Sequence, residues 1–318
     1  MDPTPQSEAE ARGVEASLPE LLEMRAPAQS LCGGPPRVAR APLVGPHRSA
    51  YRGRGIDFEE VRAYQPGDDV RNIDWRVTAR TGCVYSKVFH EERERPVWLF
   101  VDLGPSMRFG SRSRFKSVAA ARSAALVAWV SRLQGDRVGA VLRSPRGLWE
   151  RDPHPGEAPL FELFHALVRE SRLDTEAEGP SLASALLRMR ARLRVGSRVF
   201  VFSDFYGMDA EVERSLAEIS VRSHLACVSI YDALEAQAPP PARYQVSDGS
   251  AVCAFSTRGA RAREAYERAF ADRQDRLCAL SRKQRIEVVA LRTDAPTVDA
   301  LAPLLHAPRG ASAQRRVA

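Results

Sequence analysis

The run Val97-Trp98-Leu99-Phe100-Val101-Asp102 decides the fold class, because five apolar residues in a row lead to a single carboxylate. A short apolar run without alternation is typical of a parallel strand that is buried on both faces. An alanine-rich helix is predicted at 115–133, and a second strand at 137–142 follows the turn at 135–136. Strands that alternate with helices predict right-handed crossovers and a mostly parallel sheet with helices on both faces.

The same alternation continues toward the end of the chain. Further helices are predicted at 160–170, 182–193, 210–220 and 260–283, and further strands at 148–150, 198–203, 224–231 and 286–291. A β-hairpin is expected at 242–258, across Asp248-Gly249 and before the last helix. We therefore predict a doubly wound α/β domain over residues 96–306.

The segments that flank this domain have a different composition. Residues 1–48 mix proline, alanine, glycine, serine and charge, which predicts a mostly disordered leader with at most a short helical turn or two at 18–24. Residues 49–95 are rich in turn signals and contain one alternating strand at 84–90, which predicts a small β-rich collar. Residues 307–318 are predicted to form a disordered tail.

Charge and composition limit the possible partners. The chain has 318 residues, 44% of them hydrophobic, which is ordinary for a folded globular protein. Its net charge of +7 comes from arginine, since Lys87, Lys116 and Lys283 are the only lysines. The arginines are scattered among acidic residues, whereas a nucleic-acid-binding face needs them clustered. We therefore expect no nucleic-acid partner.

The cysteines and the apolar runs bear on the compartment. Five cysteines lie far apart without any C-x-x-C spacing, which is typical of reduced thiols. No apolar run approaches the roughly 20 residues that span a bilayer, and the first residues are acids and prolines. The sequence therefore predicts a cytoplasmic protein without a membrane span.

Two acidic residues directly follow predicted strands. Asp102 ends the strand at 97–101, and Asp204 follows the strand at 198–203. Because parallel strands bring their carboxyl ends to one edge of the sheet, we expect both carboxylates there, near the hydroxyls of Ser106, Ser203 and Ser181. Oxygen ligands of this type suit Mg²⁺.

These residues carry a family resemblance. Asp102-x-Gly104-x-Ser106 resembles the D-x-S-x-S motif of the metal-ion-dependent adhesion site in von Willebrand factor A domains, and Asp204 stands where that fold places a later aspartate. Upstream, the run from Arg62 to Arg80 resembles the signature of the bacterial "domain of unknown function 58" family. The resemblance implies a von Willebrand factor A-like fold, a Mg²⁺ site and a MoxR-type AAA+ ATPase as partner. The implied metal ligands are Asp102, Ser106, Ser181 and Asp204.

The chain departs from the adhesion-site motif at two ligands. Gly104 stands in the place of the first serine, so a serine at 104 is expected to restore a ligand. Thr175 and Ser181 are both candidates for the usual threonine, and Ser181 is preferred because Gly179-Pro180-Ser181 also suits a helix N-cap. The alternative interpretation is that Asp102 and Asp204 only cap loops and helix starts.

The upstream signature holds a second group of candidates. Pro66-Gly67 predicts a turn, and Asp68 or Asp69 is expected to cap a short helix that runs through Trp75. The basic and acidic residues here fit either an ion-pair network that fastens the collar to the main domain or an arginine-rich docking face for an acidic partner. The residues of that docking face would be Arg62, Asp68, Asp69, Arg71, Asp74, Trp75 and Arg80.

No arrangement of residues indicates catalysis. The sequence has no G-x-S-x-G elbow and no phosphate-binding loop, and its six histidines are dispersed. We therefore predict a non-enzymatic protein-interaction or assembly module. A metal-dependent phosphoester hydrolase is an alternative that would need a general base or a second ion. A nucleic-acid-binding protein is a further alternative, supported only by the basic isoelectric point.

Overall fold

The computed structural model describes residues 13–32, 57–65, 70, 73–90, 95–174, 179–247 and 252–305, with the backbone alone at 57–62, 87–90, 246 and 247. The chain divides into two compact units. The larger unit contains residues 1–34 and 95–306, and the smaller one contains residues 35–94 and 307–318. The tail predicted at 307–318 lies outside the described residues.

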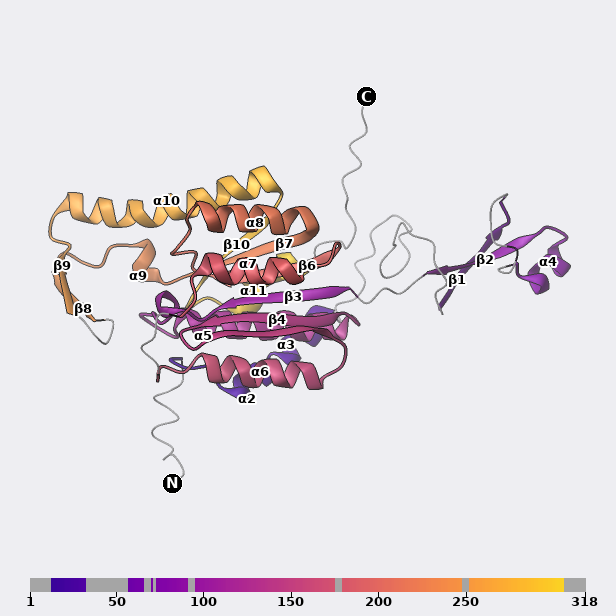
Figure 1. The fold of residues 1–318 in the computed structure, drawn as a ribbon, viewed down its shortest axis with the longest axis horizontal. Helices are drawn as coiled ribbons and strands as arrows, with labels where there is room; N and C mark the ends of the chain where they lie inside the picture. Colours follow the sequence, from indigo (N-terminus) through magenta and orange to yellow (C-terminus); the bar gives the residue numbers. More distant parts are fainter. Residues whose placement is uncertain are drawn as a thin grey trace, which may run out of the picture. The chain divides into compact units, whose positions relative to one another are not determined.

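The larger unit is built on a six-stranded sheet (Figure 1). Its strands are β3 (Pro96–Asp102), β4 (Arg137–Ser144), β5 (Gly147–His154), β6 (Ser197–Ser203), β7 (Ser223–Tyr231) and β10 (Glu287–Arg292). The spatial order is β10-β7-β6-β3-β4-β5, and every neighbouring pair is parallel except β4 and β5. The predicted α/β class with a mostly parallel sheet is confirmed.

The side chains of β3 show why the sheet needs a cover on both faces. Val97, Leu99 and Val101 belong to one hydrophobic cluster, and Trp98 and Phe100 belong to another. All five are buried. Since successive residues of a strand point to opposite faces, the two clusters lie on opposite sides of the sheet.

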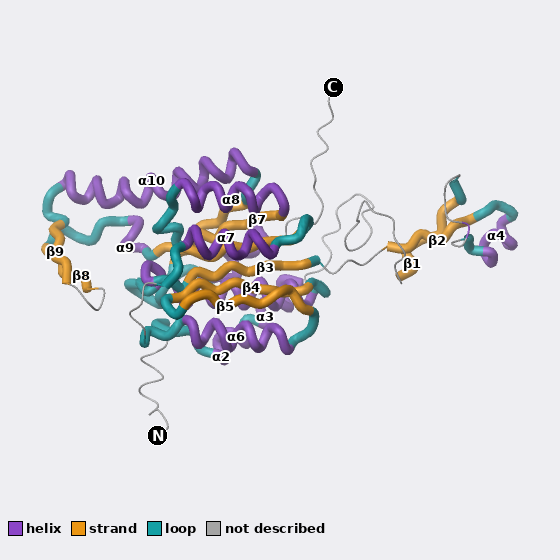
Figure 2. The backbone as a smooth tube through the Cα atoms, in the orientation of Figure 1, coloured by secondary structure: helices purple, strands orange, loops and turns teal. Residues whose placement is uncertain are grey.

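Helices cover both faces, as the tube in Figure 2 shows. The cluster with Val97 includes residues of α2 (Leu18–Glu23), α3 (Arg25–Cys32), α5 (Lys116–Leu133), α6 (Ala158–Glu170) and α11 (Thr297–Leu305). The cluster with Trp98 includes residues of α7 (Leu182–Arg192), α8 (Ala210–Arg222) and α10 (Ala260–Gln284). The short η2 (Pro105–Met107) and α9 (Ala233–Ala236) follow β3 and β7.

The hairpin expected at 242–258 has a counterpart in the structure. Strands β8 (Arg243–Ser247) and β9 (Val252–Ser256) pair antiparallel just before α10. Phe255 stacks between Tyr244 and Tyr266, with ring centroids 5.6 and 6.3 Å away. This stack attaches the hairpin to α10.

The prediction of a mostly disordered leader is wrong for residues 13–32, which pack against α5, although the short helical turn expected at 18–24 corresponds to α2. Leu21 is fully buried, and the Trp129 indole donates a hydrogen bond to its carbonyl at 3.2 Å. The Ala16 amide donates to the Ser171 hydroxyl at 3.1 Å. The physical reason is that α5 is apolar on nearly all sides. The sheet buries one side of this helix, and α2 and α3 bury another. The remainder of the predicted leader lies outside the described residues.

The smaller unit contains β1 (Asp57–Ala63) paired antiparallel with β2 (Tyr85–His90), and α4 (Trp75–Thr81) between them in sequence. The strand predicted at 84–90 is confirmed. Asp74 caps α4 by accepting from the amides of Arg76 and Val77 at 3.0 and 3.1 Å. The helix therefore begins at Trp75, whereas the sequence predicted a helix that runs through it.

Candidate functional site

The acids Asp102 and Asp204 flank the point at which the sheet changes direction. The chain proceeds from β3 to β4 and β5 on one side, and then returns to β6 on the other side of β3. In open α/β sheets, ligands bind at such a switch point, beyond the carboxyl ends of the strands. Asp102 is the last residue of β3, and Asp204 directly follows β6, its parallel neighbour. The strand arrangement thus agrees with the expectation that both acids meet at one edge.

Asp102 is buried and held from three sides. Its Oδ1 accepts hydrogen bonds from Arg143 Nη1 at 2.6 Å and from the Gly104 amide at 2.9 Å. Its Oδ2 accepts from the Ser203 hydroxyl at 2.7 Å. Burial raises the pKa of the Asp102 carboxyl above its usual range, and the charge of Asp204 acts in the same direction, while Arg143 opposes both. Arg143 is thus the resident counter-ion of this carboxylate.

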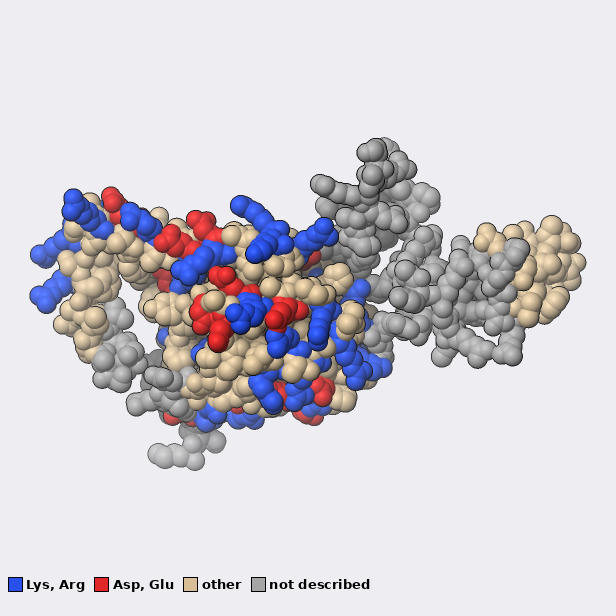
Figure 3. All heavy atoms as spheres, turned by 45° about the horizontal axis from the view of Figure 1, so that its top comes forward, with Lys and Arg blue, Asp and Glu red and all other residues tan. Residues whose placement is uncertain are grey.

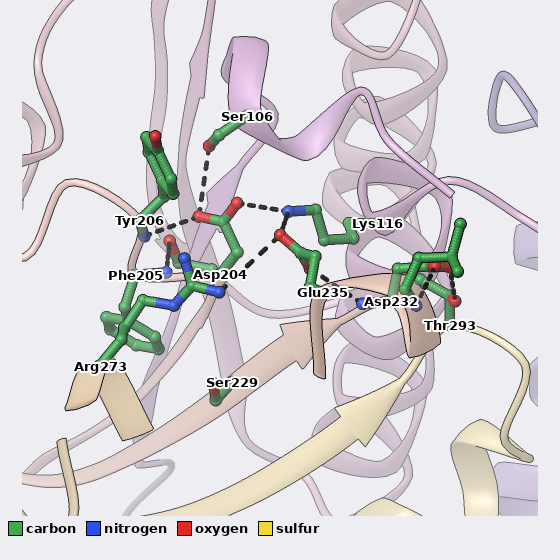
Figure 4. A network of polar contacts seen from close by, with 12 residues as sticks. Ser106, Lys116, Asp204, Phe205, Tyr206, Ser229, Asp232, Glu235, Arg273 and Thr293 are labelled. Carbon is green, nitrogen blue, oxygen red and sulfur yellow. Dashed lines mark hydrogen bonds and ion pairs between the residues drawn. The ribbon is translucent and has the colours of Figure 1, made fainter. Parts of the chain in front are cut away.

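Asp204 has a counter-ion of its own, as Figure 4 shows. Its Oδ2 accepts from Lys116 Nζ at 2.7 Å. Its Oδ1 accepts from the Ser106 hydroxyl at 3.2 Å and from the Tyr206 amide at 3.0 Å. Lys116 Nζ also lies 2.8 Å from Glu235 Oε1, and the lysine is 1% exposed. A single buried ammonium therefore bridges two carboxylates from different elements.

These contacts form one group, which we call the carboxyl-edge cluster. Its members are Asp102, Lys116, Arg143, Ser203, Asp204 and Glu235.

The cluster continues into α9. Asp232 and Glu235 form a capping box that begins this helix, and Arg273 of α10 lies 3.8 Å from Glu235. Burial disfavours the charged form of Asp232, but hydrogen bonds from Ser111 and Thr293 outweigh it and hold the pKa of Asp232 below its usual range. The edge of the sheet is thus tied to α9 and α10 through charged groups.

Gly104 lies against the Arg143 guanidinium. A Cβ atom at position 104 would overlap Nη1 and Cζ of Arg143. A serine at 104 would have to move the Arg143 guanidinium before it could act as a metal ligand, and the expectation that it restores a ligand stays a prediction. The chain thus has a glycine where the motif has its first serine, and the Arg143 guanidinium occupies the space that a side chain at position 104 would need.

The side chains of the cluster do not fit the Mg²⁺ ion that the resemblance implies. Arg143 donates to Asp102 at 2.6 Å and Lys116 donates to Asp204 at 2.7 Å. A divalent cation at bonding distance from these oxygens, about 2.1 Å for Mg²⁺, would lie against a guanidinium or an ammonium group. Repulsion between like charges at that distance opposes such a site.

The two predicted serine ligands make different contacts in the structure. Ser106 donates directly to Asp204. The Ser181 hydroxyl accepts a hydrogen bond from the Ser184 amide at 3.1 Å and caps α7, and the expected N-cap position, which made Ser181 the preferred candidate for the threonine ligand, is thus observed. Thr175 lies outside the described residues.

The candidates in the smaller unit are only partly described. Asp74 caps α4, Trp75 is 68% exposed, and Arg80 is exposed in the last turn of the same helix. Arg62 is placed in β1 by its backbone alone. The candidates Asp68, Asp69 and Arg71 lie outside the described residues.

A strained turn follows Asp204. Phe205 is fully buried with φ of 53°, in the left-handed region that residues with side chains rarely adopt. The Phe205 amide donates a hydrogen bond to the Ser203 hydroxyl at 3.1 Å, which supports this conformation. The next residue, Tyr206, is 70% exposed, and the Arg273 guanidinium lies 5.6 Å from its ring centroid. The turn thus sets an exposed aromatic ring beside the buried cluster.

Sequence reasoning did not find four residues of this network: Lys116, Arg143, Asp232 and Glu235. Asp232 carries the same signal as Asp102 and Asp204, because it directly follows a strand, β7. Lys116 carries a weaker signal, as one of only three lysines in an arginine-rich chain.

Three solved structures are similar over about two thirds of this chain. The conserved hypothetical protein BatB of Bacteroides thetaiotaomicron is 13% identical and covers 65% of this chain and 95% of its own, with a TM-score of 0.37. An aerotolerance-related membrane protein of Bacteroides fragilis is 12% identical and covers 66% and 95%, with a TM-score of 0.36. An uncharacterized membrane spanning protein of Vibrio fischeri is 15% identical and covers 67% and 96%, with a TM-score of 0.21.

The predicted cytoplasmic location is contradicted by the names of these structures, two of which are membrane proteins. The cytoplasmic location is therefore withdrawn. Structural similarities with TM-scores below 0.5 do not assign another location to this chain. Within the described part of the chain, none of the helices combines the length and the apolar character needed to cross a bilayer.

Comparison with known sequences gives relatives and a family. Uncharacterized protein Rv1480 of Mycobacterium tuberculosis and uncharacterized protein Mb1516 of Mycobacterium bovis are each 28% identical to this chain over 254 residues, which cover 79% of either sequence. Residues 60–276, which include the α4 segment of the smaller unit and most of the larger unit, match the family described as "Protein of unknown function DUF58". The chain therefore belongs to the DUF58 family.

Proposed function

We propose that this chain is a non-enzymatic, von Willebrand factor A-like protein-interaction module that acts with a MoxR-type AAA+ ATPase. The binding face in this proposal is the carboxyl edge of the sheet, around the exposed ring of Tyr206. The resemblance of Asp102-x-Gly104-x-Ser106 to an adhesion-site motif supports the fold assignment. The resemblance of residues 62–80 to the family signature supports the choice of partner.

The observation that carries the proposal is that both acids at the switch point already have resident cations. Asp102 is paired with Arg143, and Asp204 is paired with Lys116. A general base needs an oxygen that is free to take a proton, and a metal-dependent hydrolase needs oxygens that are free to bind the ion. Paired carboxylates serve neither purpose, but they do make a rigid support for a binding surface. This favours binding over phosphoester hydrolysis.

The surface over this support has features of an interaction site. Tyr206 exposes a large aromatic ring, and tyrosine is enriched among the residues that dominate binding energies. The left-handed Phe205 that precedes it costs about 1 kcal/mol, and strained residues of this kind gather at functional sites. More generally, the face of the larger unit that is turned toward the viewer in Figure 3 has interspersed basic and acidic side chains. Mixed charges of this kind suit a partner protein better than a uniformly charged polymer.

The test is a binding measurement between the full chain and the purified MoxR-type ATPase of the same organism, with ATP present. Tyr206→Ala is the site variant. Val195→Ala is the matched control, since Val195 is 86% exposed in the loop before β6, at the opposite end of the same strand. We expect Tyr206→Ala to weaken binding about tenfold or more, as for a central aromatic contact, and the control to bind like the wild type.

Two results would refute the proposal. One is the absence of binding by the folded wild-type chain in every nucleotide state of the ATPase. The other is equal binding by both variants, which would place the interface away from the carboxyl edge. Circular dichroism of each variant establishes that it is folded.

A further inference from the structure

We propose that Lys116 is a built-in cation that takes the place of a divalent metal ion at the carboxyl edge. Replacing Lys116 by a small residue would then uncover a binding site for a divalent cation between Asp204 and Glu235. The inference concerns the cluster itself and does not depend on the identity of any partner.

The geometry around Lys116 is that of an ion between two ligands. Its Nζ lies 2.7 Å from Asp204 Oδ2 and 2.8 Å from Glu235 Oε1. Calcium–oxygen distances are about 2.4 Å, so the two oxygens need to approach by only a few tenths of an ångström to hold Ca²⁺. The two carboxylates come from different elements, the end of β6 and α9, as the close-up in Figure 4 shows.

Burial makes the ammonium group essential to this arrangement. The side chains of Lys116 and Asp204 are 2% and 1% exposed, and that of Glu235 is 17% exposed. Two carboxylates brought together away from water repel one another strongly unless a cation lies between them. Lys116 supplies that charge from the chain itself.

The rest of the cluster favours a single cation at this point. Arg143 neutralises Asp102, and Arg273 lies 3.8 Å from Glu235 on the side of Tyr206. Truncation at position 116 would leave the carboxylates of Asp204 and Glu235 facing the volume that the lysine stem now fills. Water and one divalent cation can occupy that volume, whereas the wild-type chain has no room for the ion.

The experiment measures thermal unfolding and calorimetric binding of the full chain in CaCl₂ and MgCl₂, each compared with NaCl at the same ionic strength. Lys116→Ala opens the site, and Lys116→Met removes the charge but keeps the space filled. Lys283→Ala is the matched control, because Lys283 is an exposed lysine near the end of α10. n-Propylammonium, which restores the missing end of the side chain, is a second probe for Lys116→Ala.

We expect both Lys116 variants to melt well below the wild type. For Lys116→Ala alone, the divalent cation and n-propylammonium should each raise the melting temperature by several degrees, since a ligand of the native state stabilises it. The wild type, Lys116→Met and Lys283→Ala should show no shift beyond that of matched NaCl.

Saturable one-to-one binding of Ca²⁺ or Mg²⁺ by the wild-type chain would overturn the inference, because the ion would then have a site that Lys116 does not fill. Equal rescue of Lys116→Ala and Lys116→Met would overturn it as well. If Lys116→Ala does not fold, Lys116→Met combined with Asp204→Asn and Glu235→Gln decides the matter. Removing all three charges should restore most of the stability that Lys116→Met loses, and failure to do so contradicts the role of Lys116 as their counter-ion.

Discussion

Replacing Arg143 by methionine tests the charge balance of the carboxyl edge directly. Methionine keeps much of the apolar volume of the stem and removes the guanidinium, so among the described residues Asp102 keeps the Ser203 hydroxyl and the Gly104 amide as donors and loses its cation. The carbonyl of Pro180, which accepts from Arg143 Nε at 2.6 Å, also loses its donor. Both losses lower the stability of the native state.

The size of the effect follows from burial. The side chains of Arg143 and Asp102 are 13% and 2% exposed, so the pair is largely shielded from water. Removing one partner of a buried ion pair costs about 3–5 kcal/mol. The remaining access of water to Arg143 places our expectation near the lower value, about 3 kcal/mol. An exposed pair is worth about 0.2–1 kcal/mol, so the two cases are easy to distinguish.

The pH dependence has a definite sign. Burial raises the pKa of Asp102 in the folded chain, and Arg143 acts against that rise. A raised folded pKa gives stability that is present below the unfolded value and is lost as the pH increases through the folded value. Without Arg143 the folded pKa rises further, so the loss of stability continues to a higher pH and is larger in total. The destabilisation by Arg143→Met should therefore be largest at neutral pH and should shrink as Asp102 becomes protonated in acid.

The assay is urea unfolding of the wild type and Arg143→Met at several pH values between neutral and mildly acidic. Arg188→Met is the control, since Arg188 is 62% exposed and forms an ion pair with Glu150 at 3.2 Å. Asp102→Asn should cost less stability in the Arg143→Met background than in the wild type, because the unpaired charge is then gone. A cost of Arg143→Met equal to that of the control, or one that grows in acid, would refute the reasoning.

Three further outcomes can be measured on single variants or on the wild type. Gly104→Ser should lower stability by about 1–3 kcal/mol, because its side chain overlaps the Arg143 guanidinium, and urea unfolding with no loss would contradict that packing. Leu21→Ala should cost about 3 kcal/mol if the helices at 18–32 belong to the core, whereas a loss near zero would show that they are dispensable. Burial raises the pKa of the Cys227 thiol, so a thiol reagent at neutral pH should label the four exposed cysteines in the native chain and label Cys227 only after unfolding.

The fold could be predicted where hydrophobic pattern and length are both distinctive. The run at 97–102 is apolar throughout, and β3 is buried on both faces. Helix α10 was expected at 260–283 and extends over Ala260–Gln284. These elements are specified locally, by their own residues.

The helices at 18–32 were predicted only as a short helical turn at 18–24, because their stability comes from the surface of α5. Their own sequence contains proline and alanine and only a few large apolar residues. The signal lay instead in α5, whose apolar and alanine residues leave no polar face for water. A helix of that kind needs a cover on each side, and the sheet supplies only one.

The site was predicted where one rule sufficed, namely that polar residues after parallel strands gather at one edge. That rule gave Asp102 and Asp204 and could have given Asp232. It could not give Lys116 or Arg143, because their roles depend on partners 88 and 41 positions away in sequence. Long-range pairing of buried charges leaves no local pattern to read.

The start of α5 shows that Lys116 is placed against the local preference of the helix. Its N-cap, Phe115, makes no side-chain capping hydrogen bond, and the first turn contains no acidic residue. Lys116 then adds a positive charge where the helix dipole is already positive, which is unfavourable. Asp204 and Glu235 supply from other elements the negative charge that capping residues normally provide. A local conflict that is resolved only by long-range contacts is expected at functional sites more than in ordinary packing. The lysine is therefore better explained by the needs of the carboxyl edge than by those of the helix that carries it.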